Sequence, residues 1–447
     1  MVKAVKNYKS GNIVENVGTY KKESTITKHN RVFEIEIFIA VFFSSMLGAQ
    51  LFGVSLNKIA LIPLEVSLMA RYFRMHHIKL SKPAKQMFIW YAFMIVSSIM
   101  AFRIYTELDG FYNGQILNII QIIIFYIPLL SVIQYTPGLR SGLEKAILLI
   151  AKIQGVWGLA QFALWHIIHI DLNKLIFIDV FKGIFGTQWV AWYFDGISTH
   201  LRVTGLNHDP AYLALILMLG FCYEKKTLWK IFYLFIVIIA SSRSGIICLV
   251  IIWIYQSRHM NRFGKIKKKY ITWGTVALLV LTVGSYIVYT RIPSVRTQID
   301  LTISRFMGIS VIADDGSSRH LLYIIVALEI WLFEFGFVGK LFGIGPRAGG
   351  TAITMSRIEP RFTLNSVMKS RAWTVECDIA EILLGNGILG IGILYNLLFK
   401  IYKKSSLQEK MAIIGIIIMG FMYDIVNTTL IQFFLLCCIG LMTSQKE

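Results

Sequence analysis

The chain has 447 residues, of which 56% are hydrophobic and only 16% are charged, and its mean hydropathy is +0.63. Soluble domains average about 45–50% apolar and about 25% charged residues, so this composition argues against a soluble enzyme and against a disordered chain. The net charge of +20 is compatible with nucleic-acid binding, but Lys and Arg lie mostly between apolar blocks. That distribution is typical of a polytopic membrane protein and argues against a nucleic-acid partner.

Cysteine spacing and the first segment exclude further classes. The five cysteines form no CxxC pair and no Cys/His ligand spacing, and the lone Asp314–Asp315 pair has no identifiable third ligand. We therefore predict no metal site, no other cofactor and no structural disulfide. About thirty mostly polar residues precede the first apolar block, which is too long for the charged segment of a secretory signal. We expect that first block to be retained as a membrane span.

Apolar blocks of roughly 10 to 25 residues predict about twelve transmembrane helices, because only helices and closed barrels satisfy backbone groups in lipid and barrel alternation is absent. The predicted spans are Phe33–Phe52, Ile59–Phe73, Met87–Phe102, Ile116–Tyr135, Ala146–Ile168, Ala211–Tyr223, Ile231–Ala240, Ile246–Tyr255, Ile271–Tyr289, Ile379–Phe399, Met411–Tyr423 and Leu430–Met442. The predicted fold class is an all-α polytopic membrane protein.

Basic residues set the predicted orientation of these spans. With the N-terminus in the cytoplasm, a majority of the 45 Lys and Arg fall in the inner segments, as the positive-inside rule requires. Both termini are then cytoplasmic. The predicted organisation is a basic tail at 1–32, nine spans within 33–290 with an external loop near 169–207, a large periplasmic loop at 291–375, three spans within 376–442 and a C-terminus at 443–447.

One apolar segment, Leu321–Val338, is excluded from the predicted spans. Glu329 and Glu334 interrupt it, and a crossing here would place the basic loop 400–410 outside, against the positive-inside rule. We expect a helix that lies in the outer interface or re-enters the membrane. The surrounding loop, 291–374, is too long for a simple connection, and its aromatic and apolar residues indicate a folded segment.

Three consecutive predicted spans between Ala211 and Tyr255 offer about 10 to 13 residues each, whereas about 20 are needed to cross hydrocarbon. Polar residues at their outer ends should lie below the lipid surface and line a water-filled vestibule. They are Arg202, Asn207, His208 and Asp209 before the first span, and Ser241, Ser242, Arg243 and Ser244 between the other two. Polar groups at this depth are functional candidates. The alternative for Arg243 is contact with lipid phosphates from a hairpin turn.

The long external loop contains eight arginines but only two lysines. Guanidinium binds phosphate in bidentate fashion and stays charged, so this bias suits diphosphate recognition. The alternative is that these arginines are solvated and pair with acidic neighbours. Arg319 and Arg347 are the strongest candidates, because Arg319 precedes an apolar helix and Arg347 follows the Gly343–Pro346 turn.

Three carboxylates, Glu376, Asp378 and Glu381, lie where the long loop returns to the membrane. Asp378 and Glu381 can share one helix face, and acidic residues near a helix N-terminus also stabilise the helix. The functional alternative is that a carboxylate in a partly dry site acts as a general base. Asp424, near the last hairpin, could line the same vestibule or form the turn, and we favour the turn.

Several short motifs together resemble the O-antigen polymerase and ligase superfamily of integral membrane glycosyltransferases. They are Arg202-Val-Thr-Gly205 leading to His208-Asp-Pro210, Ser241-Ser-Arg243-Ser-Gly245, Arg319 before an apolar helix, Gly343-Ile-Gly345, and Glu376-Cys-Asp378 before Gly387-Ile-Leu-Gly390. The resemblance covers about Arg202 to Gly390, and the preceding residues match only as a hydropathy profile. It implies a GT-C-like helical fold in the bacterial inner membrane, with an active site that faces the periplasm.

The resemblance also implies roles for individual residues. In this superfamily, glycans linked to a polyprenyl diphosphate bind from the periplasmic side, and arginines hold the phosphates. The expected phosphate-binding residues are Arg202, Arg243, Arg319 and Arg347; the expected base is Glu376 or Asp378; His208, Asp209 and Glu381 are expected to line the cavity. The ligase branch has an important His late in the loop, whereas this chain has none between Arg361 and Glu376. The chain is therefore more similar to the polymerase (Wzy-type) branch, while His320 leaves ligase-like chemistry open.

The leading hypothesis is a polymerase that transfers a growing glycan from undecaprenyl diphosphate to the sugar acceptor of another undecaprenyl-diphosphate-linked oligosaccharide. Expected partners are those lipid-linked sugars, membrane lipids, and a chain-length regulator and a flippase. One alternative is a ligase that transfers the glycan to lipid A core. An alternative from another class is a flippase for the same lipid-linked sugar. The long loop and the absence of repeat symmetry argue against it.

Overall fold

The computed structural model describes residues 16–72, 80–104, 111–185, 192–259, 289–300, 316–356 and 375–444, apart from gaps of one or two residues within these ranges. Helices dominate these parts of the chain. The described strands form two short antiparallel hairpins, β1 (Gln50–Leu51) with β2 (Val54–Ser55) and β3 (Trp192–Phe194) with β4 (Ile197–Arg202). The all-α class predicted from the sequence is therefore confirmed.

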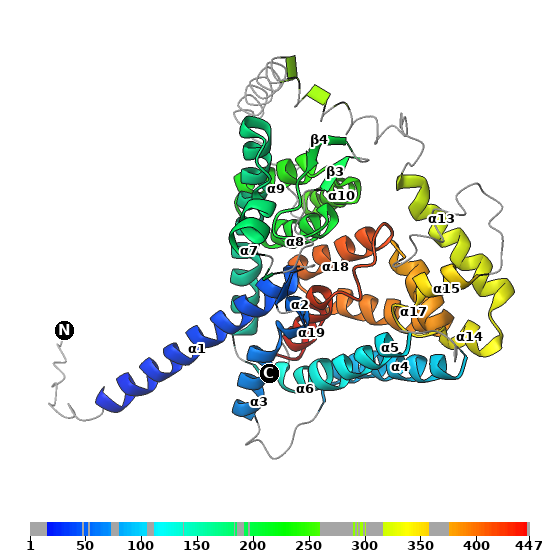
Figure 1. The fold of residues 1–447 in the computed structure, drawn as a ribbon. Coiled ribbons are helices and arrows are strands. Elements are labelled where there is room, and N and C mark those ends of the chain that lie inside the picture. Colours follow the sequence, from blue (N-terminus) through cyan, green and yellow to red (C-terminus); the bar gives the residue numbers. More distant parts are fainter. Residues whose placement is uncertain are drawn as a thin grey trace, which may run out of the picture.

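The first half of the chain forms one projecting helix and a set of packed helices (Figure 1). These are α1 (Asn16–Ser45), α2 (Leu56–Ile59), α3 (Ile62–Tyr72), α4 (Lys82–Ile104), α5 (Phe111–Gln121), the π-helix η1 (Ile122–Tyr126), α6 (Ile127–Ile133), α7 (Leu139–Ile168) and the π-helix η2 (Lys174–Val180). The sequence placed the end of the first span at Phe52, but α1 ends at Ser45 and a β-hairpin follows it.

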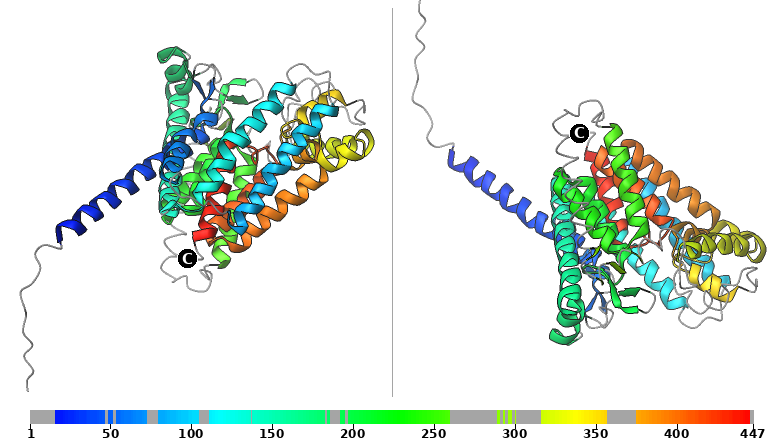
Figure 2. Two further views of the ribbon diagram at one scale, coloured as in Figure 1. Left: turned by 90° about the horizontal axis from the view of Figure 1, so that it is seen from below. Right: turned by 90° about the horizontal axis from the view of Figure 1, so that it is seen from above.

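The second half supplies the central helices and a peripheral group. Its helices are α8 (Pro210–Tyr223), α9 (Thr227–Ile239), α10 (Arg243–His259), α13 (Gly316–Glu329), the π-helix η4 (Ile330–Glu334), α14 (Phe337–Phe342), α15 (Gly349–Met355), α17 (Asp378–Lys404), α18 (Leu407–Gly420) and α19 (Thr429–Ser444). In Figure 2, α17 lies alongside α4, and α13–α15 gather at one end of this pair.

Four helical segments are long and apolar enough to cross a membrane. They are Lys82–Phe102, Gly114–Ile133, Leu139–Ile168 and Asp378–Lys404, and α8, α9 and most of α19 are shorter apolar helices. Each long segment matches a span predicted from the sequence. Ile89, Leu117 and Val156, on three of them, are 54%, 53% and 53% exposed, as expected for side chains that face lipid. The chain is therefore a helical membrane protein, and the total of twelve spans stays a prediction.

Two further predictions concern a span that lies mostly outside the described residues and an apolar segment that the structure divides among several helices. The predicted span Ile271–Tyr289 lies, except for Tyr289, outside the described residues. The apolar segment Leu321–Val338 is divided among α13, η4 and the start of α14 rather than forming one helix. Phe333 and Phe337, each 77% exposed, point away from the helices that these elements pack on. The location of the segment Leu321–Val338 at the outer interface stays a prediction.

Helix α8 lies at the centre of the second half. Every residue of α8 except Tyr212 is buried, because its sequence is apolar on all sides and neighbouring helices surround it. In the chain, α9 connects α8 to α10, and α10 runs in the same direction as α8. Gly245 of α10 packs directly on Ala214 of α8. Close approach of these two helices therefore depends on a residue without a side chain.

The two ends of α8 define two ends of the surrounding bundle. α8 and α10 begin at the first end. Tyr212, at the start of α8, lies within electrostatic range of Asp378, the first residue of α17. α18 also ends there, because Gly420 lies against the Asp378 carboxylate. We call this the site end, and we call the opposite end, at which α8 ends and α18 begins, the distal end.

Candidate functional site

A break in α17 fixes one wall of the site end. Gly387, with φ 66° and ψ −171°, interrupts the helix, and such a residue disrupts the regular ladder of backbone hydrogen bonds. The N–H groups of Ile344 and Gly345 donate to the carbonyls of Leu384 and Gly385 beside the break, at 3.0 and 2.8 Å. Irregular backbone at membrane depth persists where protein buries it or a cavity adjoins it. The break therefore anchors the turn that leads to Arg347.

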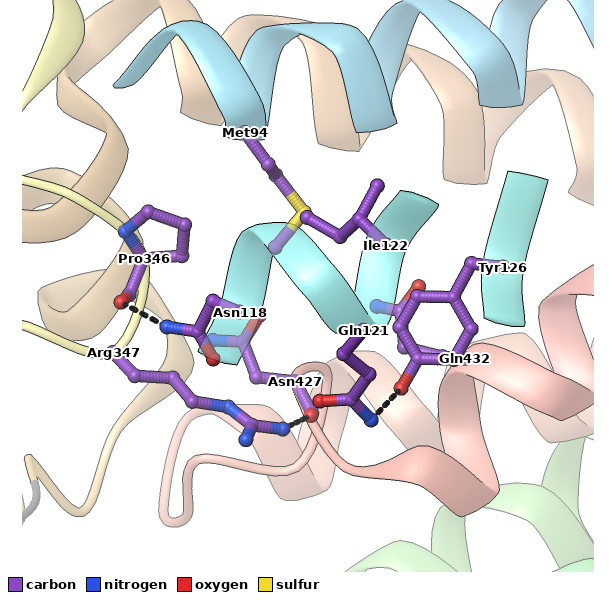
Figure 3. Close-up of a pocket in the computed structure, with 9 residues that line it drawn as sticks. All are labelled: Met94, Asn118, Gln121, Ile122, Tyr126, Pro346, Arg347, Asn427 and Gln432. Carbon is purple, nitrogen blue, oxygen red and sulfur yellow. Dashed lines mark hydrogen bonds between the residues drawn. The ribbon is translucent and has the colours of Figure 1, made fainter. Parts of the chain in front are cut away.

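Arg347 is held in an unusual backbone conformation. Its φ is 61°, in the left-handed region that costs a residue other than glycine about 1–2 kcal/mol. Gln115 and Asn118 fix the turn by donating to the Pro346 carbonyl at 3.0 and 3.1 Å. The guanidinium donates to the Asn427 carbonyl (Figure 3), yet the residue is exposed. The surrounding structure thus fixes the backbone and leaves a positive charge accessible, an arrangement that is common at functional sites.

A small cavity lies behind Arg347. It is lined by Met94, Asn118, Gln121, Ile122, Tyr126, Pro346, Arg347, Asn427 and Gln432 (Figure 3). Its volume of about 20 Å³ is enough for about one water molecule. The accessible side of Arg347 is therefore its exposed side rather than this cavity.

Two buried carboxylates hold the loops at the site end. Asp378, 2% exposed, accepts the N–H groups of Ile425 and Val426 on Oδ1 at 2.9 and 3.0 Å. Glu381, also 2% exposed, accepts the N–H of Gly349 on Oε1 at 3.1 Å. Buried backbone N–H groups normally have a hydrogen-bond partner, and here the carboxyl oxygens supply it. These two side chains therefore position the α18–α19 loop and the start of α15.

Asp424 completes this group, which we call the carboxylate cluster: Asp378, Glu381, Asp424 and the adjacent Arg347. Asp424 is half-buried and accepts hydrogen bonds from Asn427 Nδ2 at 3.3 Å and from the carboxyl group of Asp378. Burial raises the pKa of Asp424, and the Arg347 guanidinium is the largest opposing influence. The sequence favoured a turn for Asp424; it lies in that turn and also belongs to the site.

A second group of charges lies where α8 and α10 begin. Arg202, 7% exposed, donates Nη2 to the Ser241 carbonyl at 3.5 Å, so the end of β4 lies against the α9–α10 turn. Arg243, the first residue of α10, is half-buried. Asp209 caps α8 by accepting the Ala211 N–H at 2.7 Å. Helix N-termini carry partial positive charge and attract anions. We call Arg202, Arg243 and these two N-termini the arginine group.

Tyr212 connects the two groups. It is the residue of α8 that is not buried, and its ring centroid lies 5.4 Å from that of His208. It lies within electrostatic range of Asp209 on one side and of Asp378 and Asp424 on the other. The start of α8 and the carboxylate cluster therefore adjoin one another at the site end.

The structure brings most of the predicted site residues together at this end. Arg202, Arg243, His208 and Asp209 lie around the starts of α8 and α10, while Arg347, Asp378 and Glu381 lie around the start of α17. Glu376 is half-buried and lies two residues before α17. Arg319 lies in α13, but its side chain is outside the described residues, so its role in phosphate binding stays a prediction.

The sequence reasoning missed two positioning residues of α7. Gln161 accepts the N–H of Gly205 on Oε1 at 2.7 Å, and Gln154 accepts the N–H of Leu206 at 2.7 Å. These bonds fix the irregular segment that leads to Asp209. Two glutamines seven residues apart share one face of a helix, and their presence in an apolar span is a signal that could have identified them.

Within the described residues, no group of three or more His, Cys, Asp or Glu side chains is arranged to hold a metal ion. Comparison of the chain with protein-family models and with curated proteins finds no match. The functional assignment therefore depends on the motifs and on the geometry of the site end.

Proposed function

We propose that this protein is a bacterial membrane glycosyltransferase that extends a surface polysaccharide. It would transfer a growing glycan from undecaprenyl diphosphate to the sugar acceptor of another lipid-linked repeat unit, at the periplasmic face of the inner membrane. The observation that supports this proposal is the position of Tyr212, at the start of α8 beside Asp209, within electrostatic range of Asp378 and Asp424 of the carboxylate cluster. Positive charge suits a diphosphate leaving group, and half-buried carboxylates suit deprotonation of an acceptor hydroxyl.

The arginine group would bind the leaving diphosphate. In the reaction, the bond between the anomeric carbon and the diphosphate oxygen breaks, and its electron pair leaves with the diphosphate. Arg243 and the N-terminus of α10 would stabilise that charge. Arg202 is buried against Ser241, so it would position the turn. Arg347 is exposed and, with Arg319, would bind phosphate from the opposite side.

The carboxylate cluster would receive the proton as the acceptor oxygen bonds to the anomeric carbon. Asp378 is buried and uses Oδ1 to hold the α18–α19 loop, which favours a positioning role. Glu376 and Asp424 are half-buried and are the better candidates for the base. The raised pKa of Asp424 makes its ionised form a stronger proton acceptor than an ordinary aspartate.

The test is polymerisation by the purified protein with lipid-linked repeat units as both donor and acceptor. The wild type should produce a ladder of extended glycans, and the ladder should persist in EDTA. Arg243→Ala should abolish extension, whereas Arg258→Ala, on the exposed distal part of the same helix, should not. An intact ladder from folded Arg243→Ala would reject the proposal. Activity only when lipid A core is added as acceptor would indicate a ligase instead.

A second candidate function, transport of the same lipid-linked sugar, is favoured by the break in α17. Secondary transporters commonly bind substrate at interrupted membrane helices, and Gly387 places such an interruption beside buried carboxylates. Proteoliposomes separate the two functions. Movement of single repeat units across the bilayer without any ladder would support transport, and a ladder from units supplied on one side would support polymerisation.

A further inference from the structure

A second, larger cavity lies at the distal end of the bundle. Its volume is about 460 Å³, and cavities of about 300–1,000 Å³ are typical of small-ligand sites. The ends of α8 and α10 and the starts of α9 and α18 contribute its lining. It lies at the end of α8 opposite Asp209, and a helix of this length spans about 21 Å. The cavity is therefore separate from the candidate active site.

A carboxylate in the wall of this cavity has one oxygen that no hydrogen bond uses. Glu224 is 6% exposed and lines the cavity. Its Oε1 accepts the N–H groups of Lys225 and Lys226 at 2.9 Å each. Its Oε2 lies 3.5 Å from Lys152 Nζ but has no hydrogen-bond partner among the described residues. Because buried polar atoms normally have a partner, Oε2 indicates a ligand that donates a hydrogen bond.

A buried hydroxyl is a second, independent sign of a ligand. Tyr223, the last residue of α8, is 4% exposed and lines the cavity, and its Oη has no hydrogen-bond partner among the described residues. Gln256, which also lines the cavity, accepts a hydrogen bond from Lys230 Nζ on Oε1 at 2.6 Å, so its Nε2 remains a donor. The lining therefore offers hydrogen-bond donors and acceptors together.

The charges in the lining favour a neutral ligand over an ion. The Glu224 carboxylate would repel an anion, and Lys225 and Lys230, which line the same cavity, would repel a cation. Lys225 Nζ also pairs with Glu144 Oε1 at 3.2 Å. A neutral hydroxyl both donates and accepts hydrogen bonds. A ligand with several hydroxyl groups therefore matches this mixed lining without depending on any uncompensated charge.

An indole ring selects the kind of hydroxyl-bearing ligand. Trp253 lines the cavity and is 42% exposed, and its ring centroid lies 6.3 Å from that of Phe221. The C–H face of a sugar ring packs on an exposed aromatic face of this kind, while its hydroxyls bond to nearby polar groups. We propose that the cavity binds a neutral sugar ring, with Glu224 and Tyr223 as hydrogen-bonding ligands and Trp253 as the packing surface. This assignment does not depend on the proposed function.

The experiment is saturation-transfer NMR of the full-length protein in a polyoxyethylene detergent, which carries no sugar headgroup. The probes are the methyl glycosides of glucose, galactose and N-acetylglucosamine, and the wild type should bind at least one of them. Because a hydrogen bond to a charged acceptor is lost, Glu224→Gln should weaken that binding about ten-fold. Tyr223→Phe should weaken it about three-fold. Tyr233→Phe is the matched control, since the Tyr233 hydroxyl is also buried without a partner among the described residues but does not line the cavity.

The outcomes are separable even if one variant misfolds. Tyr223→Phe keeps the shape of the side chain, so it tests the site when thermal unfolding shows that Glu224→Gln is unstable. Octyl glucoside below its micelle concentration distinguishes the sources of the sugar. Tighter binding than methyl glucoside, with the same losses in the variants, would support a glycolipid headgroup, and equal binding would support a free sugar.

Three results would overturn the proposal. The first is the absence of saturation transfer to every probe. The second is equal binding by Tyr223→Phe and Tyr233→Phe, which would assign the sugar to another part of the protein, including the candidate active site. The third is tighter binding of a glucose phosphate than of methyl glucoside, which would make the ligand an anion.

Discussion

The two groups at the site end hold their polar side chains in different ways. In the carboxylate cluster, Asp378 and Glu381 are almost completely buried and bind backbone N–H groups of neighbouring loops. In the arginine group, Arg243 is half-buried at the start of a helix. Buried carboxyl groups of the first kind build the site, whereas an accessible charge of the second kind can contact a substrate. Substitutions should therefore separate loss of folding from loss of activity.

The largest expected effect on folding is that of Asp378→Ala. It removes the acceptor for the N–H groups of Ile425 and Val426, and each buried unsatisfied donor costs about 1–3 kcal/mol. The free energy of unfolding should fall by about 2–6 kcal/mol, measured as a loss of thermal stability in detergent. Asp378→Asn keeps an oxygen acceptor and should retain most of that stability. Equal stability of Asp378→Ala and the wild type would refute the anchoring role.

A second substitution tests the break in α17. Gly387→Ala would place Cβ in steric conflict with the Leu341 carbonyl oxygen, in a backbone region that is essentially limited to glycine and costs about 1–3 kcal/mol. Thermal stability and chain extension should both fall. Gly392→Ala is the matched control in the same helix, because its Cβ would meet no atom within 4 Å; it should stabilise the helix by about 0.5–1 kcal/mol. The reverse order of stabilities would contradict the observed break.

The helices could be predicted from the sequence because hydropathy is a local property. The predicted span Ile379–Phe399 lies within the helix Asp378–Lys404, and Ala146–Ile168 lies within Leu139–Ile168, which begins seven residues earlier. The break at Gly387 could not be predicted in this way. Glycine in an apolar stretch usually indicates close helix packing, and here the backbone of Ile344 and Gly345, far away in the chain, stabilises the interrupted geometry.

Site residues could be predicted from the sequence where a charged side chain lies within or beside an apolar segment. Arg243 and Arg347 carry charges within or beside apolar segments, which marks each of them without knowledge of the fold. The sequence gives no comparable indication for Asp424, because polar residues are common in loops between two predicted spans. Its membership of the site depends on Asp378, which contacts the same loop across a long sequence separation. Contacts of that kind require the packing of α17, α18 and α19.

A smaller effect is expected at the segment that leads to the arginine group. Gln161→Leu leaves the N–H of Gly205 without its acceptor, at a cost of about 1–3 kcal/mol. Chain extension should fall moderately while the protein still folds, because the segment before Asp209 is loosened rather than removed. Gln408→Leu, a change of the same residue type at the distal end, is the control. Identical activities of these two variants would argue against a positioning role for α7.

The smallest expected effect, and the one that tests contact between Arg347 and Asp424 most directly, is on the pH dependence of the reaction. If Asp424 is the base, it must be ionised, so the rate should fall as the pH drops through its raised pKa. The Arg347 guanidinium lowers that pKa against the effect of burial. Arg347→Gln should therefore raise the pKa of Asp424 and move the acid limb of the rate profile to higher pH, whereas Arg347→Lys should largely preserve the limb. A loss of rate in Arg347→Gln with the acid limb unmoved would assign Arg347 to phosphate binding alone and leave Glu376 as the base.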